Sequence, residues 1–321
     1  MVPTTSVADP APRFVGGWGE LGPGPEQFDR PRGLDIDAGG IVYITDDRRH
    51  HVQKFDRTGN LLGGWGQMGS APGDFKAPMG IAVDDRGAVY VVDRGNFRIQ
   101  KFTVDGEFLR QWGAFGAAPG SFTSPAYIAA DSSGNVFVTD GARVQKFTAD
   151  GDFVRAWGSL GFGDGEFRNA FGIAVAPDQT VYVGNAGLDG ADKTANIQRF
   201  TNDGVFLARW ATFGEFAGQL MTPIGVDVDS QGDVYVVDHH NFRIEKFTRD
   251  GVFMCEWGER PGIFDAPHDL VVDRDDDLFI IDLTSSGGII LHFSYGTAAQ
   301  ATSWADVKGL FAPRGPATDK R

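Results

Sequence analysis

The stretch that decides the fold is residues 75–113, FKAPMGIAVDDRGAVYVVDRGNFRIQKFTVDGEFLRQWG. It contains four short runs, GIAVD, AVYVVD, RIQKF and EFLRQW, which are either fully apolar or alternate between apolar and polar residues. The turn sequences DRG, DRGN and VDG separate neighbouring runs. This pattern predicts four antiparallel strands. A sheet of this size cannot bury both of its faces alone, so it needs similar sheets as neighbours.

The same stretch recurs along the whole chain. Its opening, of the Pro-x-Gly type, is found at six positions: Pro31, Pro78, Pro125, Ala170, Pro223 and Pro267. The seven tryptophans keep one phase, with spacings of 47, 47, 45, 53, 47 and 47 residues: Trp18, Trp65, Trp112, Trp157, Trp210, Trp257 and Trp304. A period of 40 to 50 residues with four strands per unit is typical of a β-propeller. We predict an all-β, six-bladed propeller of four-stranded antiparallel blades, with the tryptophans packed between blades.

Six sets of first, second and third strands face seven candidate fourth strands, because residues 13–19 and residues 299–304 both keep the tryptophan phase. One terminal segment must therefore close the ring. Residues 13–19 retain the Gly-Trp-Gly signature, so we expect the N-terminal segment to supply the closing strand. The predicted organisation is a disordered leader over 1–12, one propeller over 13–304 and a flexible tail over 305–321.

The motifs at residues 78–84, 89–93 and 96–102 read PMGIAVD, VYVVD and NFRIQKF. They resemble the NHL repeat, and the resemblance covers nearly the whole chain. It implies a propeller, but propellers of this family include scaffolds, sensor domains and enzymes. The fold therefore does not decide the function.

Composition narrows the range of partners. The formal net charge of −14 disfavours nucleic acid, because an acidic surface repels phosphates. No early apolar run of signal-peptide length and no membrane span is visible, so we expect a cytoplasmic protein that does not bind membranes. A processed N-terminus is an alternative that the sequence leaves open. The single cysteine, Cys255, allows no intrachain disulfide and fits a reducing compartment. We expect a monomer.

The first strand of every propeller blade lines the central axis, so the residue after each opening position should point into one funnel. These six residues, which we call the axial ring, are Arg32, Met79, Ala126, Phe171, Ile224 and His268. The next position holds Gly33, Gly80, Tyr127, Gly172, Gly225 and Asp269. We expect the polar members Arg32, Tyr127, His268 and Asp269 to line the mouth of the funnel. The structural alternative is that Arg32 and Asp269 pair with each other and that His268 is a hydrogen-bonded structural residue.

Two functional hypotheses follow. The first is a binding or scaffold module for a protein or small molecule. Its ligand-binding residues would be Arg32, Met79 and Phe171 on the axis, and Arg48, His51, Arg94, His239, His240 and the insertion 185–196 on the loops. The second is a lyase or hydrolase at the axial mouth. In such an enzyme Arg32 would stabilise an anion, and Tyr127 or His268 would act as the general acid or base.

The enzyme hypothesis draws on a second resemblance. Residues 267–270, PHDL, are similar to the Pro-His-Asp-Ile motif of the peptidylglycine alpha-amidating lyase family. The resemblance implies zinc at His268 and calcium at Asp269. The other two zinc-binding histidines of that family would fall on alternate blades, where this chain has Met79 and Phe171. A zinc centre needs three protein ligands, so zinc and calcium are implied without a complete ligand set.

Overall fold

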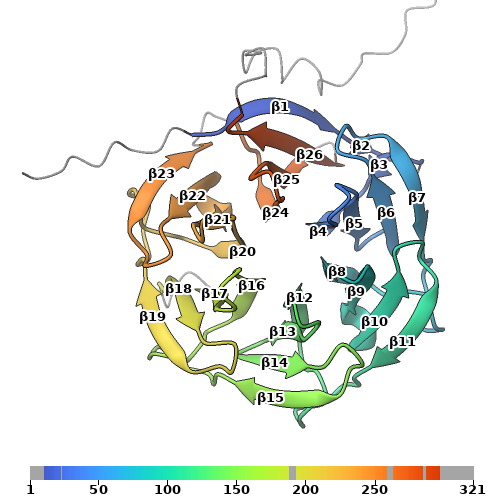
Figure 1. Cartoon of the computed structure of the whole chain (residues 1–321), viewed down its shortest axis with the longest axis horizontal. Coiled ribbons are helices and arrows are strands. Elements are labelled where there is room, and N and C mark those ends of the chain that lie inside the picture. Colours follow the sequence, from blue (N-terminus) through green and yellow to red (C-terminus); the bar gives the residue numbers. More distant parts are fainter. Residues whose placement is uncertain (1–10, 23, 188–192, 259–262, 285–286, 297–321) are drawn as a thin grey trace, which may run out of the picture.

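The computed structural model describes residues 11–22, 24–187, 193–258, 263–284 and 287–296. Six four-stranded antiparallel sheets stand radially around a central axis (Figure 1). Within each blade the strands follow one another outward from the axis. The predicted six-bladed, all-β propeller is confirmed.

The first three blades are regular copies of one unit. The first contains β4 (Pro31–Ile36), β5 (Val42–Asp46), β6 (His51–Phe55) and β7 (Leu61–Trp65). The second contains β8 (Pro78–Val83), β9 (Ala88–Asp93), β10 (Arg98–Thr103) and β11 (Phe108–Trp112). The third contains β12 (Pro125–Ala130), β13 (Val136–Asp140), β14 (Arg143–Phe147) and β15 (Phe153–Trp157).

The remaining blades complete the ring. The fourth contains β16 (Ala170–Val175), β17 (Val181–Ala186), β18 (Ala195–Phe200) and β19 (Phe206–Trp210). The fifth contains β20 (Pro223–Val228), β21 (Val234–Asp238), β22 (Arg243–Phe247) and β23 (Phe253–Trp257). The sixth contains β24 (Pro267–Val272), β25 (Leu278–Thr284), β26 (Gly287–Ser294) and, as its outer strand, β1 (Arg13–Trp18).

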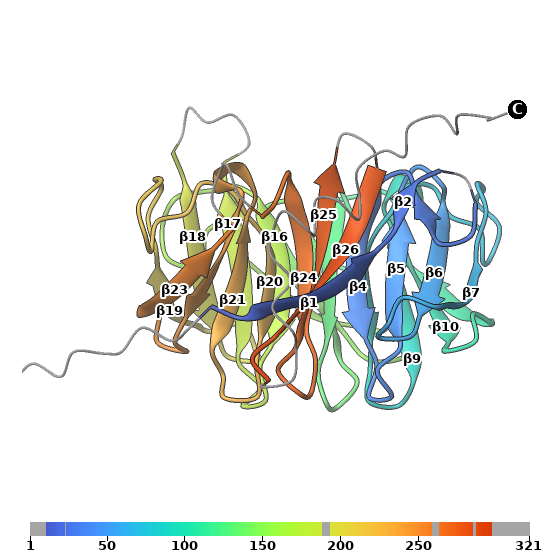
Figure 2. The ribbon, with the colours of Figure 1, turned by 90° about the horizontal axis from the view of Figure 1, so that it is seen from above.

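The ring is closed by the N-terminal segment. Strand β1 pairs antiparallel with β26, from Arg13 opposite Ser294 to Trp18 opposite Ile290. Figure 2 shows β1 lying across the outside of the sixth blade. The expectation that the N-terminal segment supplies the closing strand is therefore confirmed. The competing segment 299–304 and the predicted tail 305–321 lie outside the described residues, as does most of the predicted leader.

The repeated tryptophan packs between blades, as predicted. Trp65, at the end of the first blade, lies with its ring centroid 5.5 Å from that of Phe102 in the second blade. Trp112 is placed in the same way against Phe147 of the third blade, at 5.9 Å. A large aromatic ring that leaves water at each blade junction contributes several kcal/mol of hydrophobic stabilisation, which explains the recurrence of the residue.

Glycine in the first strand lets the blades approach closely at the axis. A Cβ atom on Gly80 would lie 2.8 Å from the Cα of Tyr127 in the next blade. A Cβ on Gly172 would lie 2.5 Å from the carbonyl oxygen of Ile224. Both distances are shorter than van der Waals contact, so these positions require glycine for packing.

One face of the ring, which we call the loop face, carries the turns between second and third strands and the linkers between blades. The turns include the 3₁₀ helices η1 (Arg94–Asn96) and η2 (His239–Asn241), and the first linker contains the short parallel pair β2 (Glu20–Leu21) and β3 (Gln27–Phe28). In the described parts of the chain, no helix is both long and apolar enough to cross a membrane.

An aspartate near the end of the second strand, replaced by Asn185 in the fourth blade, fixes the linkers of the loop face. Asp46 accepts a hydrogen bond from the backbone N–H of Asp29 at 2.7 Å, and Asp93 accepts one from Lys76 at 2.7 Å. Such charge-assisted bonds hold the backbone before each first strand in place. They thereby fix the backbone positions of the axial-ring residues.

Candidate ligand site at the axial mouth

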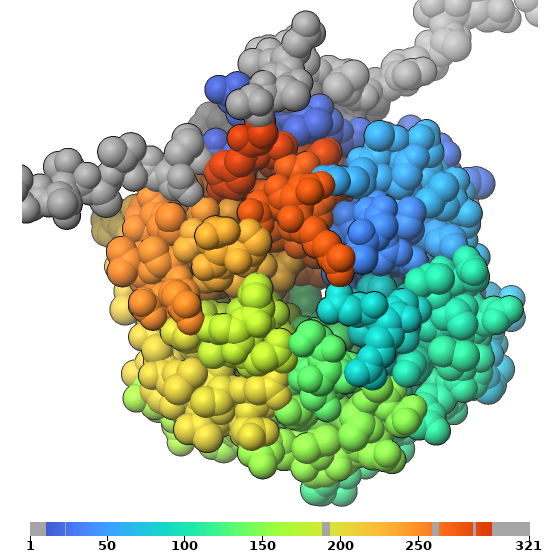
Figure 3. All heavy atoms as spheres, in the orientation of Figure 1, coloured from blue at the N-terminus to red at the C-terminus, as the bar shows by residue number. Residues whose placement is uncertain are grey.

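The loop face opens into a cavity of about 380 Å³ on the axis. Figure 3 shows the blades meeting around a central opening. All six axial-ring residues line this cavity, so the structure brings together side chains from every blade. The full lining is Arg30, Arg32, Asp47, Ala77, Met79, Arg94, Ser124, Ala126, Tyr127, Gly141, Asn169, Ala170, Phe171, Ile224 and His268.

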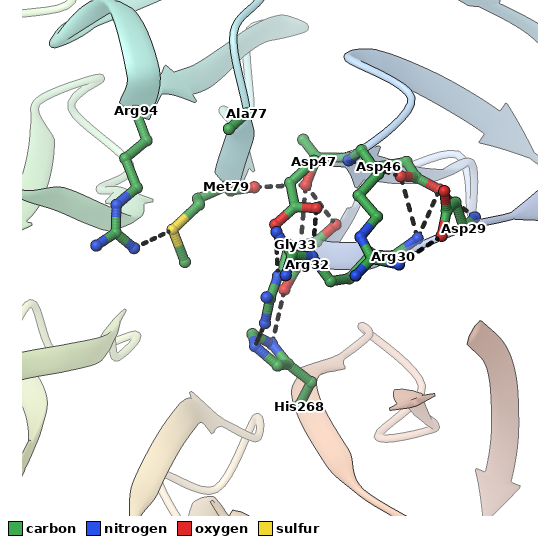
Figure 4. Close-up of polar contacts among 12 residues, drawn as sticks. Asp29, Arg30, Arg32, Gly33, Asp46, Asp47, Ala77, Met79, Arg94 and His268 are labelled. Carbon is green, nitrogen blue, oxygen red and sulfur yellow. Dashed lines mark hydrogen bonds and ion pairs between the residues drawn. The ribbon is translucent and has the colours of Figure 1, made fainter. Parts of the chain in front are cut away.

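Arg32 is held by an aspartate of its own blade. Its Nε donates to Asp47 Oδ2 at 2.8 Å, while Arg30 Nε donates to Asp47 Oδ1 at 2.6 Å (Figure 4). Asp47 is buried, with 5% of its surface exposed, and it accepts from both guanidinium groups. The expected alternative, an ion pair between Arg32 and Asp269, is not what the structure shows. The Nη1 group of Arg32 contacts His268 Nε2 instead.

The contacts of His268 define its tautomer. Its Nδ1 lies 3.2 Å from the carbonyl oxygen of Arg32, and its Nε2 lies 2.5 Å from Arg32 Nη1. Because a carbonyl only accepts and a guanidinium only donates, Nδ1 must carry the proton and Nε2 must accept. The ring is therefore neutral. Burial, reinforced by the charge of Arg32 and by His239, lowers the pKa of His268 well below its usual value of 6.5.

We expect His268 to stay neutral across the pH range in which a free imidazole takes up a proton. Nitrogen-15 NMR of histidine-labelled protein, with the signal assigned by a His268→Asn variant, should show the Nδ1–H tautomer persisting below pH 6.5. Only the unfolded chain then binds a proton at this residue, so its contribution to stability should be lost as the pH falls below about 6.5. An imidazolium signal from His268 at pH 6 would contradict this geometry.

Tyr127 lies beside His268 at the bottom of the mouth cavity. Its hydroxyl is 3.5 Å from His268 Nδ1, and the two rings are nearly parallel at a centroid distance of 6.5 Å. The side chain is buried, and burial raises the pKa of Tyr127 well above its usual value of 10. The phenol is therefore neutral and can donate a hydrogen bond. Tyr127 also lines a second cavity, which places it between the two.

The second cavity, of about 550 Å³, contains Asp269. Asp269 Oδ2 accepts a hydrogen bond from the backbone N–H of Leu34 in the next blade at 3.3 Å. Asp35 and Asp227 make equivalent bonds, to the N–H groups of Val83 and Val272, each at 2.7 Å. Burial raises the pKa of both Asp35 and Asp227 to about 7. These carboxyls join first strands of neighbouring blades, which accounts for their presence on the axis.

The residues at the mouth do not fit a zinc centre. The lone pair of His268 Nε2, which a metal would need, accepts from Arg32. Asp269 lines the other cavity rather than the one that His268 lines. Within the described residues, no group of three His, Cys, Asp or Glu side chains is placed to hold a metal ion. A zinc ion bound by His268 would have to displace the Arg32 guanidinium.

The predicted loop residues separate into two groups. Arg94 lines the mouth cavity, and His239 lies next to it, with its ring centroid 6.1 Å from that of His268. Arg48 is not among the residues that line the cavity; it is exposed and pairs with Asp29 at 3.1 Å. His51 starts β6 and contacts the Gly66 carbonyl at 2.8 Å, away from the axis. His240 is exposed, and its Nδ1 lies 2.6 Å from Thr222 Oγ1. Residues 188–192 of the predicted insertion lie outside the described part of the chain.

Two further sets of lining residues were not identified from the axial-ring pattern. One is the residue immediately before each opening position: Arg30, Ala77, Ser124 and Asn169. The other is the residue after the aspartate that ends the second strand in the first three blades: Asp47 and Gly141, together with Arg94, which was already named among the loop residues. Both sets keep the repeat phase, so aligning the blades at these two positions as well would have identified them.

Comparisons with known proteins agree with the fold. The NHL repeat pattern matches residues 28–55, 75–102 and 220–247. No curated protein matches the sequence. Solved structures that resemble it include a gluconolactonase from Xanthomonas campestris, with a TM-score of 0.60, 19% identity and coverage of 89% of this chain and 96% of that one.

Two further solved structures are similar. One is virginiamycin B lyase from Staphylococcus aureus, with a TM-score of 0.56, 17% identity and coverage of 87% of each chain. The other is a luciferin-regenerating enzyme, with a TM-score of 0.60, 14% identity and coverage of 85% of this chain and 94% of that one. At such identities the likeness shows a shared fold and does not carry a function.

Proposed function

We propose that this propeller, three of whose repeats match the NHL pattern, is a binding module that takes a small molecule into the mouth cavity. The observation that carries the proposal is the convergence of all six first strands on one space of about 380 Å³. Sites for small molecules typically occupy about 300 to 1000 Å³ and combine apolar walls with a few polar groups. Phe171 and Ile224 supply apolar wall here, and Arg32 supplies polar contacts.

Blocking the mouth tests this proposal. Ser124 is half-buried on the cavity wall, whereas Ser132 is exposed and lines the second cavity on the same blade. Saturation-transfer NMR with a mixture of small acids, amides and amines should detect bound compounds in the wild type and in Ser132→Trp. The signals should be lost in Ser124→Trp. Binding that survives Ser124→Trp would place the site elsewhere, for example on the outer loops, where a protein partner would be captured.

A lyase or hydrolase is the second candidate. The neutral phenol of Tyr127 lies beside His268, whose Nε2 lone pair is occupied by Arg32, so the phenol is the group that can donate a proton while the guanidinium stabilises a developing charge. The named activities of the similar structures, gluconolactonase and virginiamycin B lyase, suggest the substrates to try.

The enzyme candidate predicts turnover that depends on Tyr127. Purified protein would be incubated with gluconolactone and with virginiamycin B, and ring opening would be followed by mass spectrometry. A rate that falls at least tenfold in Tyr127→Phe, while the fold is retained, would support catalysis at the mouth. Equal rates in the variant and the wild type, or no turnover of either compound, would leave the binding module as the better description.

A further inference from the structure

Arg94 differs from the other arginines of the mouth cavity in its partners. Its Nη1 is directed at the sulfur of Met79 at 2.7 Å, and its Nη2 lies 3.4 Å from Ser124 Oγ. Among the described residues, no carboxylate lies within 4 Å of this guanidinium. The residue is exposed to solvent and lines the cavity. Arg94 therefore has N–H groups available to a ligand.

The cavity carries an excess of positive charge. Its lining contains three guanidinium groups, of Arg30, Arg32 and Arg94, but the single carboxylate of Asp47. His268 is neutral, so it does not alter the balance. Partial desolvation lowers the pKa of Arg94, and the positive charge of Arg32 lowers it further. This local excess occurs in a chain whose net charge is −14. An anion in the cavity would be attracted by this excess of positive charge.

The charges are confined to one side of the cavity. Arg30 and Arg32 come from the first blade and Arg94 from the second, and Figure 4 shows Arg32 and Arg94 on either side of Met79. The third, fourth and fifth blades contribute apolar wall. That wall is formed by Ala126, Ala170, Phe171 and Ile224. A ligand that matches both sides has an anionic head and an apolar body.

We infer that the mouth cavity binds a small organic acid, with its carboxylate held by Arg94 and Arg32 and its apolar body against Phe171 and Ile224. This inference rests on the proposed function, since it names the ligand class for the same site. Guanidinium groups bind carboxylates through paired N–H donors. Asp47 has a positioning role, because it fixes Arg32 without neutralising Arg94. The volume of about 380 Å³ limits the ligand to a small molecule.

Matched acid and amide probes test the inference. Phenylacetate and hexanoate would be compared with phenylacetamide and hexanamide, which have the same shape without the charge, by isothermal titration calorimetry or NMR titration. The wild type should bind each acid at least tenfold more tightly than its amide. In Arg94→Gln this preference should fall to about twofold, while amide binding stays unchanged. Arg94→Lys should keep part of the preference, because it retains the charge but loses the planar pair of donors.

Three controls test separately the location of the site, the contribution of the ligand's apolar part and the contribution of its charge. Arg48→Gln removes a guanidinium that does not line the cavity, on a side chain that is 57% exposed, and should leave both affinities unchanged. Phe171→Ala should weaken the binding of acids and of amides by the same factor, because it removes apolar wall and no charge. Inorganic phosphate is an anion without an apolar part. If it binds as tightly as the organic acids, the apolar wall does not contribute to binding.

The failure of this inference can be distinguished from the failure of the proposed function. If acids and amides bind equally and both are lost in Ser124→Trp, the mouth is a ligand site but not an acid site. If no probe responds to Ser124→Trp, the proposed function fails as well. Circular dichroism spectra of each variant would confirm that a lost affinity does not reflect a lost fold.

Discussion

A chain that begins at residue 19, and so lacks strand β1, should lose cooperative folding. Strand β1 supplies the outer strand of the sixth blade, and its removal would leave the edge of β26 unpaired. It would also remove Trp18, whose ring lies 6.1 Å from that of Phe55 and 6.0 Å from that of Phe279. The loss of one strand and one interblade aromatic ring should cost more than about 5 kcal/mol. Thermal unfolding followed by circular dichroism, with size-exclusion chromatography for aggregation, would measure the effect.

A chain that begins at residue 11 is the matched control, because it retains β1. Adding a synthetic peptide of residues 11–19 to the shortened chain should restore part of the lost melting temperature. A different result would arise if residues 299–304, which keep the tryptophan phase, can replace β1. The shortened chain would then remain folded, and the N-terminal strand would not be the essential closure.

The fold was predictable because the same four-strand sequence pattern occurs six times in the chain. The recurrence of tryptophan every 45 to 53 residues reflects one packing requirement, met at each blade junction by contacts such as that of Trp65 with Phe102. The same phase identified all six axial-ring residues as neighbours. In a ring, equal positions in equal units must meet at the centre, so periodicity alone brings together side chains that are far apart in the sequence.

The pairing within the site was less predictable. Arg32 was expected to meet either a ligand or Asp269, but it is bound by Asp47, because the turn after β5 brings Asp47 back to the start of β4. Asp269 follows His268 directly in sequence, yet it lines the other cavity. Periodicity fixes which positions face the axis. It does not fix which partner each side chain chooses, since that depends on loop geometry specific to one blade.

The fifth blade differs from the repeat at one buried position, and restoring the repeat residue there should stabilise the protein. In the first four blades a buried glutamine of the third strand bridges the linker, as when Gln100 accepts from the N–H of Gly73 and donates to the carbonyl of Asp74. The fifth blade has Glu245 at this position, with no exposed surface. Burial raises the pKa of Glu245 to about 9, despite the opposing charge of Arg243 at 2.5 Å.

We expect Glu245→Gln to stabilise the protein at pH 7. Between pH 4.5 and about 9 the folded chain holds a proton on Glu245 that the unfolded chain releases, so this residue lowers stability as the pH rises through that window. Each pKa unit corresponds to about 1.4 kcal/mol, so removing a cost that accumulates from pH 4.5 to pH 7 should raise the free energy of unfolding by about 3 kcal/mol at pH 7. The dependence of stability on pH between 5 and 9 should also become weaker. Urea unfolding at several pH values would measure both effects.

The second blade offers the reciprocal control. There Arg98 pairs with Asp93 at 2.7 Å and contacts Gln111, so Gln100 has surroundings like those of Glu245 with one fewer acid. Gln100→Glu should therefore destabilise the protein and introduce the pH dependence that Glu245→Gln removes. If both substitutions destabilise by similar amounts, the Glu245 carboxylate is ionised and paired with Arg243. The fifth blade would then be stabilised by a buried ion pair rather than by a neutral acid.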